Sequence, residues 1–329
     1  MNLYNLPKKL LKTSALLFLG NPFLLKMKIN LIKKRNCLTV LNLHRVGVAD
    51  GSSYIPFDPL LFEELLIFLK SNFELIIFDK LADVKKSKKP KLILSFDDGY
   101  KDFIYNVVPI LKKHKIQANL NIIPSCVESQ LPPLNIMAQD FIGKAPLELI
   151  KKLSIPGFNL KPYLPFGKII VGLHLSNFIK NRSMNKQEAM RKVLIPQFYE
   201  FEEFHPTKMM SLDEIKQISK YHEIGAHSYS HASMEYEDDE YLSDDLLKCY
   251  EYFNNSVNTS VNIYAFPNGS VRENQVRLAL EFGYKHVLLV GNLFSNLTNN
   301  THTRFGFYAN SKKEAFFRAT GGLTKPSLN

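Results

Sequence analysis

Short apolar runs alternate with longer helical patterns along most of this 329-residue chain, and this alternation restricts the possible folds more than any other feature. The apolar runs predict strands at residues 38–43, 73–78, 92–96, 118–123, 223–226, 261–266 and 286–290. The segments between them predict helices at 60–69, 102–113, 212–220, 240–253 and 271–282. Strands separated by helices form mainly parallel sheets, because parallel pairing needs a crossover connection. About seven such strands predict an α/β fold, a distorted (β/α) barrel rather than an open sheet.

Two of the predicted helices begin with a capping-box pattern. The patterns are Ser211-Leu-Asp-Glu214 and Ser270-Val-Arg-Glu273. In each, the serine and glutamate side chains can satisfy backbone N–H groups of the first turn. Both helices are therefore predicted to begin at these residues.

The domain organisation predicted from the pattern has three parts. Residues 1–36 form a basic leader, and residues 37–325 form a single α/β domain. Within that domain, residues from about 124 to 207 break the alternation and are rich in proline and mixed charge. We interpret them as a central loop and helix insertion on the loop side of the sheet, where substrate loops of such folds concentrate.

The charge balance favours anionic partners. The chain has 42 basic and 31 acidic residues, a net charge of +11, and eight of the basic residues lie in the leader. The apolar stretch of the leader, residues 15–25, is too short to span a bilayer. Peripheral contact of this leader with an anionic membrane is one hypothesis; a helix that is solvated or packed on the core is the other. No nucleic-acid motif is present, so we expect no nucleic-acid partner.

Cysteine usage and targeting patterns bear on location. The three cysteines, Cys37, Cys126 and Cys249, have no CxxC spacing and leave an odd count, which favours a reducing compartment. No clear cleavage site for a signal peptide follows the leader. We therefore expect a cytoplasmic protein, with the inner membrane face as the place of any peripheral contact.

The strand at 92–96 ends in two adjacent carboxylates, Asp97 and Asp98, followed by Gly99. Neighbouring residues of an extended chain point to opposite sides, so the two carboxylates can have different roles. In parallel α/β folds this carboxyl end of the strand is where active sites lie. The alternative is an ordinary Asp-Asp-Gly turn.

A second motif, His227-Ser-Tyr-Ser-His231, follows the short strand at 223–226. Two histidines four residues apart can bind one divalent metal, with Asp98 as the third ligand and open positions left for water. A pair of surface histidines is the alternative.

Together the two motifs resemble those of the polysaccharide deacetylase family, the NodB-type carbohydrate esterases. Ser95-Phe-Asp-Asp-Gly99 is similar to the first motif of that family, and His227 to His231 to the second. Tyr264-Ala-Phe-Pro-Asn-Gly-Ser270 resembles the third motif. The resemblance continues through Val40 to Val46 at the start and Thr303 to Phe307 at the end.

The resemblance implies a NodB-like deacetylase barrel and a role for each matching residue. Asp97 is the implied general base, Asp98, His227 and His231 are the implied ligands of a divalent metal, often zinc, and the backbone N–H of Asn268 is the implied contact of the oxyanion. We add four predicted substrate contacts: His44, Tyr100, Phe266 and Pro267. For His44, a role as a core histidine is the alternative.

The implied activity is hydrolysis of acetyl groups from N-acetylated sugars. The expected substrate is a cell-surface polysaccharide, a lipopolysaccharide or a lipid-linked glycan precursor. An O-acetyl esterase on a similar glycan is an alternative. So is a catalytically silent carbohydrate-binding barrel, because three family features are missing: the arginine of the third motif, a tryptophan, and a late histidine that neither His286 nor His302 convincingly matches. The general acid is left unassigned.

Overall fold

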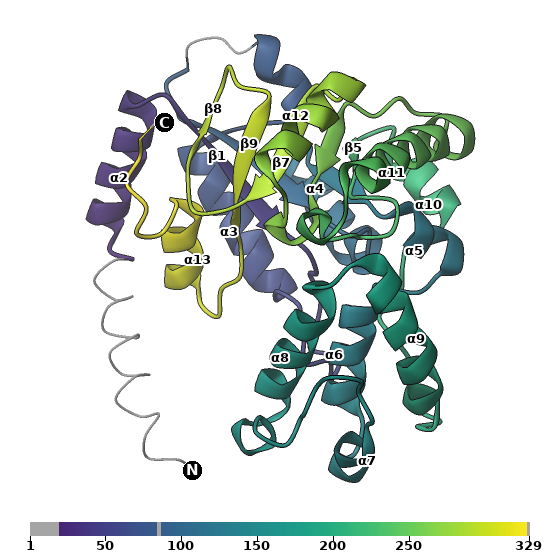
Figure 1. Ribbon diagram of the computed structural model, residues 1–329. Helices are drawn as coiled ribbons and strands as arrows, with labels where there is room; N and C mark the ends of the chain where they lie inside the picture. Colours follow the sequence, from purple (N-terminus) through teal and green to yellow (C-terminus); the bar gives the residue numbers. More distant parts are fainter. Residues whose placement is uncertain (1–19, 84–86, 328–329) are drawn as a thin grey trace.

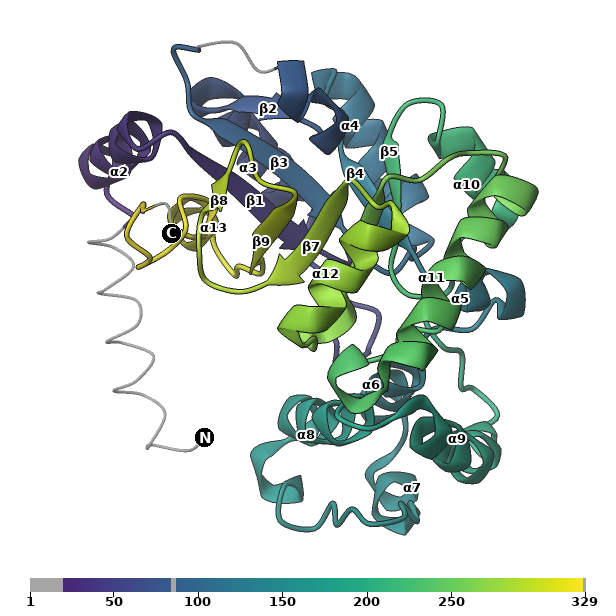
Figure 2. The same cartoon turned by 45° about the horizontal axis from the view of Figure 1, so that its top comes forward.

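The computed structural model describes residues 20–83 and 87–327 (Figure 1). A sheet lies at the centre, helices cover its outside, and a further group of helices projects from one end (Figures 1 and 2). Residues 1–19 of the predicted leader lie outside the described residues. None of the helices in the described segments combines the length and apolarity needed to cross a membrane.

Seven parallel strands close into a barrel, as predicted. They are β1 (Cys37–Leu43), β3 (Lys91–Phe96), β4 (Asn119–Ile122), β5 (Glu223–Ala226), β6 (Ile263–Ala265), β7 (His286–Val290) and β9 (Thr301–Gly306). The order around the ring is β3-β4-β5-β6-β7-β9-β1. Pairing of β1 with β3, from Leu38 opposite Lys91 to Leu43 opposite Phe96, closes the ring.

One of the seven predicted strands was assigned wrongly. Residues 73–78 yield only β2 (Glu74–Ile76), which pairs with β3 outside the ring. The seventh barrel strand is β9, whose side chains toward the barrel interior include His302 and Arg304. Because these side chains are polar, β9 has no apolar run for a sequence pattern to detect. A short strand, β8 (Ser295–Asn296), pairs antiparallel with β1.

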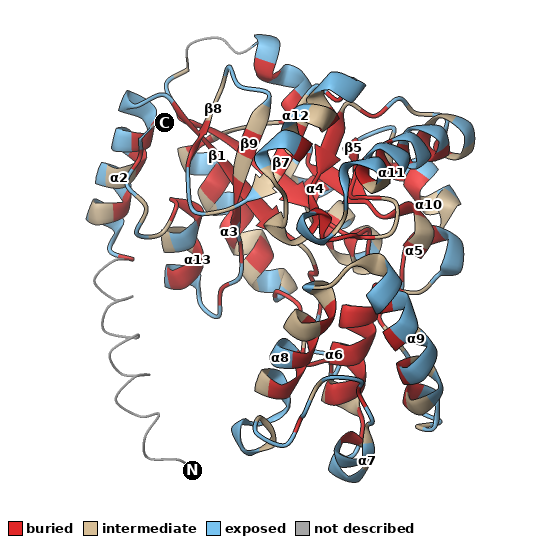
Figure 3. Ribbon diagram, viewed as in Figure 1, coloured by how far each residue is buried: buried red, intermediate tan, exposed pale blue. Residues whose placement is uncertain are grey.

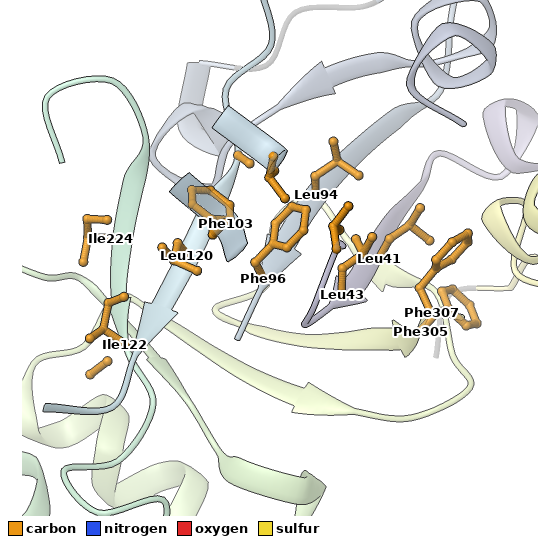
Figure 4. Packing of buried hydrophobic residues seen from close by; sticks show 14 of the residues in the cluster. Leu41, Leu43, Leu94, Phe96, Phe103, Leu120, Ile122, Ile224, Phe305 and Phe307 are labelled. Atoms are coloured by element: carbon orange, nitrogen blue, oxygen red, sulfur yellow. The ribbon is translucent and has the colours of Figure 1, made fainter. Parts of the chain in front are cut away.

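Strands β1 and β3 are buried on both faces along their whole length (Figure 3). Side chains alternate along each strand, so one set packs inward and the other packs against the surrounding helices. The outward set includes Leu41, Leu43, Leu94, Phe96 and Leu120, which join one continuous apolar cluster (Figure 4). A smaller apolar cluster inside the barrel contains Leu38, Val40, Ile93 and Ile263.

The helices that cover the barrel are α2 (Pro22–Lys34), α3 (Pro59–Asn72), α4 (Val108–His114), α10 (Leu212–Ile218), α11 (Asp239–Tyr252), α12 (Glu273–Phe282) and α13 (Lys312–Ala319). Five of them, α2, α3, α10, α11 and α13, begin at a residue whose side chain accepts from a backbone N–H of the first turn. A π-helical turn, Phe103–Val107, precedes α4. The predicted capping box of Ser211 and Glu214 is confirmed. The box predicted at Ser270 is wrong, because α12 begins three residues later and the Gln275 side chain accepts from the Arg272 N–H.

The predicted central insertion is helical and has a core of its own. It leaves the carboxyl end of β4 and contains α5 (Pro124–Ser129), α6 (Leu134–Lys144), α7 (Leu147–Lys152), α8 (Lys168–Lys180) and α9 (Met184–Tyr199). Apolar side chains from α6, α7, α8 and α9 form a cluster separate from those of the barrel, with Phe141 stacked on Phe198 at a ring distance of 4.8 Å. Figures 1 and 2 show α6, α8 and α9 grouped at one end of the barrel.

Candidate metal and catalytic centre

The two adjacent aspartates lie at the carboxyl end of β3. On this strand Ile93 packs in the interior cluster, and Ser95 bonds to groups inside the barrel. Asp97 continues the same alternation and therefore points into the mouth of the barrel. Asp97 is 2% exposed and Asp98 is 3% exposed. Carboxylates so fully removed from water require strong partners nearby.

The turn after Asp97 explains the glycine of the first motif. Asp98 has a φ of 77° and Gly99 a φ of 82°, so both residues adopt the left-handed conformation. A Cβ atom at Gly99 would also lie 3.1 Å from the Ile122 side chain. Glycine avoids both the backbone strain and this contact. In this conformation both carboxylates approach His227 Nε2, Asp98 Oδ1 at 3.3 Å and Asp97 Oδ2 at 3.7 Å.

Asp97 is held by a buried network inside the barrel. Its Oδ1 atom accepts from Arg304 Nη1 at 2.7 Å and from Asn121 Nδ2 at 2.7 Å, and its Oδ2 atom accepts from Arg304 Nη2 at 2.9 Å. Burial disfavours the charged carboxylate, but the Arg304 guanidinium and the His227 imidazole hold its pKa well below the usual range. Asp97 is therefore fixed in position and ionised.

Arg304 is a site residue that the sequence prediction did not identify. It lies on β9, is fully buried, and also donates to Ser95 Oγ at 3.0 Å and to Asn42 Oδ1 at 3.3 Å. The third motif lacks the arginine that orients the base in many family members, and Arg304 supplies a guanidinium to Asp97 from another strand. The sequence did contain one indication of Arg304: it lies within Thr303 to Phe307, a segment that resembles the family.

Asp98, His227 and His231 converge at the barrel mouth. The Asp98 Oδ1 atom lies 3.3 Å from His227 Nε2 and 3.4 Å from His231 Nε2. All three side chains are buried, and each offers one ligand atom within 4.8 Å of the other two. The structure thus brings together all three predicted metal ligands.

The chemistry of these atoms fits a bound cation. His227 Nδ1 lies 2.8 Å from the Ala265 carbonyl oxygen, which can only accept, so Nδ1 carries the proton. The Nε2 lone pair then faces Asp98 Oδ1, a buried oxygen that makes no hydrogen bond among the described residues. Burial lowers the pKa of His227, but the Asp97 and Asp98 carboxylates raise it overall, so positive charge is favoured at this point. A divalent metal provides such charge and can accept a lone pair from His227 Nε2 and another from Asp98 Oδ1.

The pKa of His231 is shifted in the opposite direction to that of His227. Burial, which disfavours the imidazolium, lowers its pKa to about 4 despite the charge of Asp98. Its ring is therefore neutral near pH 7 and has a free lone pair, as a metal ligand requires. Its ring centroid lies 5.2 Å from that of His227.

A buried carboxylate from α11 holds the histidine loop. Asp245 Oδ2 accepts from Ser228 Oγ at 2.8 Å and from the Tyr229 N–H at 3.0 Å, while its Oδ1 accepts from the Tyr264 hydroxyl at 2.6 Å. Ser228 and His231 both have positive φ values, 56° and 62°. These bonds stabilise a strained loop that aims both imidazoles at Asp98. The sequence prediction missed Asp245, because nothing in a helical pattern marks it.

His44 and Tyr100 lie beside the aspartates. His44 follows β1 and is half-buried, and its charge acts on both Asp97 and Asp98. Tyr100 is fully buried, and its hydroxyl makes no hydrogen bond to any described residue. Tyr54, which was not predicted, lines the same cleft as His44, and its ring centroid is 6.3 Å from that of His44. Burial and the Asp98 charge raise the pKa of both tyrosines.

Three other predicted residues directly follow β6. Asn268 lies in the turn after β6, where its side chain donates to Ser233 Oγ at 3.0 Å; the role of its backbone N–H stays a prediction. Phe266 is fully buried in the outer apolar cluster and contacts Tyr264. Pro267 is also buried. The structure therefore does not bring Phe266 to the barrel mouth, because the alternation along β6 turns it outward.

The two late histidines lie at the other end of the barrel. His286 is the first residue of β7 and His302 the second of β9, so both are at the amino ends of parallel strands. They contact each other and Phe78. Neither can donate a proton at the opposite end.

The sequence model of the polysaccharide deacetylase family matches residues 84–158 and 176–287, which is more than half of the chain. The chain belongs to the polysaccharide deacetylase family. It is accordingly a carbohydrate deacetylase with a NodB-type barrel. A comparison with curated protein sequences finds no match to this deacetylase.

Solved structures share the fold of this deacetylase at low sequence identity. The Streptococcus pyogenes deacetylase PplD, in complex with acetate, is 15% identical with a TM-score of 0.57; the match covers 86% of this chain and 98% of PplD. IcaB from Ammonifex degensii is 15% identical with a TM-score of 0.53, covering 86% and 97% of the two chains. A polysaccharide deacetylase from Bacillus cereus is 15% identical with a TM-score of 0.55, covering 86% of this chain and 69% of that one. These likenesses confirm the barrel.

Proposed function

We propose that this deacetylase is a metal-dependent hydrolase of N-acetylated sugars in a cell-surface polysaccharide, a lipopolysaccharide or a lipid-linked glycan precursor. One observation carries the proposal: Asp98, His227 and His231 converge at the barrel mouth directly beside an ionised Asp97. These residues combine the ligands of an open metal site with a general base. Such a combination suits hydrolysis of an amide more than binding alone.

Asp98, His227 and His231 would hold the metal, and mixed carboxylate and imidazole donors favour zinc. When bound, the metal supplies Lewis acidity toward a water molecule and the acetyl carbonyl. Three protein ligands leave coordination positions open, which distinguishes a catalytic site from a structural one. The bond from His227 Nδ1 to the Ala265 carbonyl fixes the ligand tautomer.

Asp97 would accept the proton of the attacking water. Its bidentate pair with Arg304 keeps it ionised and fixes its direction. The same pair disfavours a protonated Asp97, so the proton must be passed on before the next cycle. The attack breaks the amide C–N bond, acetate leaves, and the sugar retains the amine. A backbone N–H at Asn268 remains our proposed contact of the oxyanion.

His44 is our candidate for the group that protonates the leaving amine. Its charge acts on both aspartates, and it lines a cleft of about 440 Å³ together with Tyr54, Phe57 and Tyr308. An imidazole can donate a proton near neutral pH. The late histidines, His286 and His302, are at the wrong end of the barrel.

Two clefts flank the centre and would receive the glycan. The cleft at His44 lies on one side; a second cleft of about 400 Å³ contains His231, Ser125, Gln187 and Arg191 on the other. A chain of sugars could occupy both clefts with one residue at the metal ligands. The three cysteines are free and buried, which supports our proposal of a reducing, cytoplasmic location.

The proposal is tested by acetate release from a panel of N-acetyl and O-acetyl saccharides, including lipid-linked ones. The metal-loaded protein is compared with Asp97→Asn, which keeps the shape but removes the base. We expect release from an N-acetylated substrate and a loss of about 10²–10⁴-fold in the variant. Release from O-acetyl saccharides alone would identify an esterase. Binding of glycan without release from any substrate would support a silent barrel.

A further inference from the structure

Helix α2 has apolar side chains on the face turned away from the protein. Leu25, Ile29 and Ile32 are buried against the barrel domain. Phe23, Met27 and Leu31, four residues apart and therefore on one side of the helix, are 68%, 55% and 40% exposed. Single exposed apolar side chains are ordinary, but an exposed stripe over successive turns is not.

The C-terminal segment extends this apolar stripe. Leu323 is 79% exposed, and a groove of about 640 Å³ runs between α2 and residues 322–326, with Met27, Leu31 and Phe317 in its wall. Lys28 joins the two sides, because its Nζ donates to the Gly322 carbonyl and lies 5.6 Å from the centre of the Phe317 ring. Figures 1 and 2 both show α2 at the outer edge of the barrel beside this segment. The apolar surface is therefore built from both ends of the chain and fixed as one unit.

The charges around this surface have a single sign. Lys26, Lys33 and Lys34 on α2 and Lys325 in the C-terminal segment are exposed. No acidic residue occurs in the sequence before Asp50, and none follows Glu314. Neither α2 nor residues 322–326 therefore contains a carboxylate that could offset these lysines. A surface with exposed aromatic and aliphatic side chains bordered by lysines is complementary to an anionic lipid bilayer.

We propose that α2 and residues 322–326 form a docking face for an anionic phospholipid membrane. Phe23, Met27, Leu31 and Leu323 enter the interfacial region, and the surrounding lysines contact lipid phosphates. The helix lies along the bilayer surface, since its opposite face is packed on the barrel domain. The proposal is independent of the hydrolase chemistry, because none of these residues belongs to the catalytic centre.

The test is sedimentation of the full chain with vesicles of phosphatidylglycerol and phosphatidylcholine, beside vesicles of phosphatidylcholine alone. We expect binding to the anionic vesicles only, with a loss at high salt. The triple variant Phe23→Ser/Met27→Ser/Leu31→Ser and the triple variant Lys26→Gln/Lys33→Gln/Lys34→Gln should each bind at least tenfold more weakly. Leu60→Ser is the matched control, because Leu60 is 76% exposed on α3 and lies next to acidic residues.

The outcomes separate the possible occupants. Absence of wild-type binding to anionic vesicles would overturn the proposal. Undiminished binding by both triple variants would overturn it too, because the membrane contact would then belong to residues outside this face. A change from dimer to monomer in the apolar variant would instead assign the face to a second copy of the chain. Circular dichroism confirms folding of each variant. Acetate release from a soluble substrate should be unchanged, so failure of the docking face is distinct from failure of the hydrolase proposal.

Discussion

Each end of the barrel contains a pair of histidines, buried except for the half-buried His286, and the two pairs differ in chemistry. At the carboxyl end, the ring centroids of His227 and His231 are 5.2 Å apart, and both rings face Asp98. At the amino end, those of His286 and His302 are 5.3 Å apart, and the rings pack on Phe78. Of the described residues, only the first set forms a possible metal site.

The difference shows what a histidine pair needs to bind metal. Carboxylates beside His227 favour positive charge there. Burial and the neighbouring His286 instead lower the pKa of His302 to about 3, and burial also lowers that of His286, so that pair stays neutral. At the amino end the Asp79 carboxylate acts on His286 but does not offset burial, and the pair behaves as part of the core. At the carboxyl end the two adjacent aspartates raise the pKa of His227, so that site attracts a cation. Four predictions test this contrast, from the largest expected effect to the smallest.

Of the two histidine pairs, only the one at the carboxyl end of the barrel should be needed for metal binding and activity. We expect one equivalent of divalent metal per chain and loss of activity to background after chelation, because the Lewis acid is removed. His231→Ala should lose most of the bound metal, since two ligands remain. His302→Gln should keep it. Elemental analysis measures the bound metal, and acetate release measures the activity. Metal retained by His231→Ala would contradict the assigned site.

Arg304→Met should leave a buried Asp97 charge unpaired. We expect the free energy of unfolding to fall by about 3–5 kcal/mol, measured by urea titration, because the desolvated carboxylate loses its partner. Activity should fall as well, since Asp97 loses its orientation. The double variant Arg304→Met/Asp97→Asn should recover part of the stability. Equal stability of the wild type and Arg304→Met would show that the pair does not hold the site.

His44→Gln should slow the proton transfer to the leaving amine. We expect kcat to fall about 10²-fold with metal content unchanged. An aryl acetate should be much less affected, because its leaving group needs no proton. His302→Gln at the other end is the control and should keep its kcat. An equal loss on both kinds of substrate would assign His44 to substrate positioning instead.

The smallest effect concerns acid stability at the amino end. His302 is neutral when folded, with a pKa of about 3 against 6.5 when unfolded. Its contribution to stability is therefore present above pH 6.5 and is lost as pH falls from 6.5 toward 3, by at most about 1.4 kcal/mol per pH unit. His302→Gln should show a shallower decline in the free energy of unfolding between pH 7 and 5. If the free energies of unfolding of the wild type and of His302→Gln decline in parallel, His302 is already protonated in the folded protein or its charge is shielded from its surroundings.

The sequence by itself determined the barrel and the central residues of the site. Six of the seven barrel strands are marked by apolar runs, because most of their side chains are buried. Asp97, Asp98, His227 and His231 were found because each motif is short, local and placed after a strand. Local patterns of this kind can be recognised in the sequence without knowing which residues surround them in the fold.

Only the tertiary structure decided the rest. Strand β9 carries polar side chains into the barrel, so its pattern did not predict a strand, and Arg304 meets Asp97 across 207 positions of sequence. Asp245 and Tyr54 reach the site from a helix and a loop with no motif of their own. Conversely, Phe266 lies in a motif yet points outward. Long-range contacts depend on register and closure of the barrel, and these are set by the packing of the whole domain rather than by any local segment.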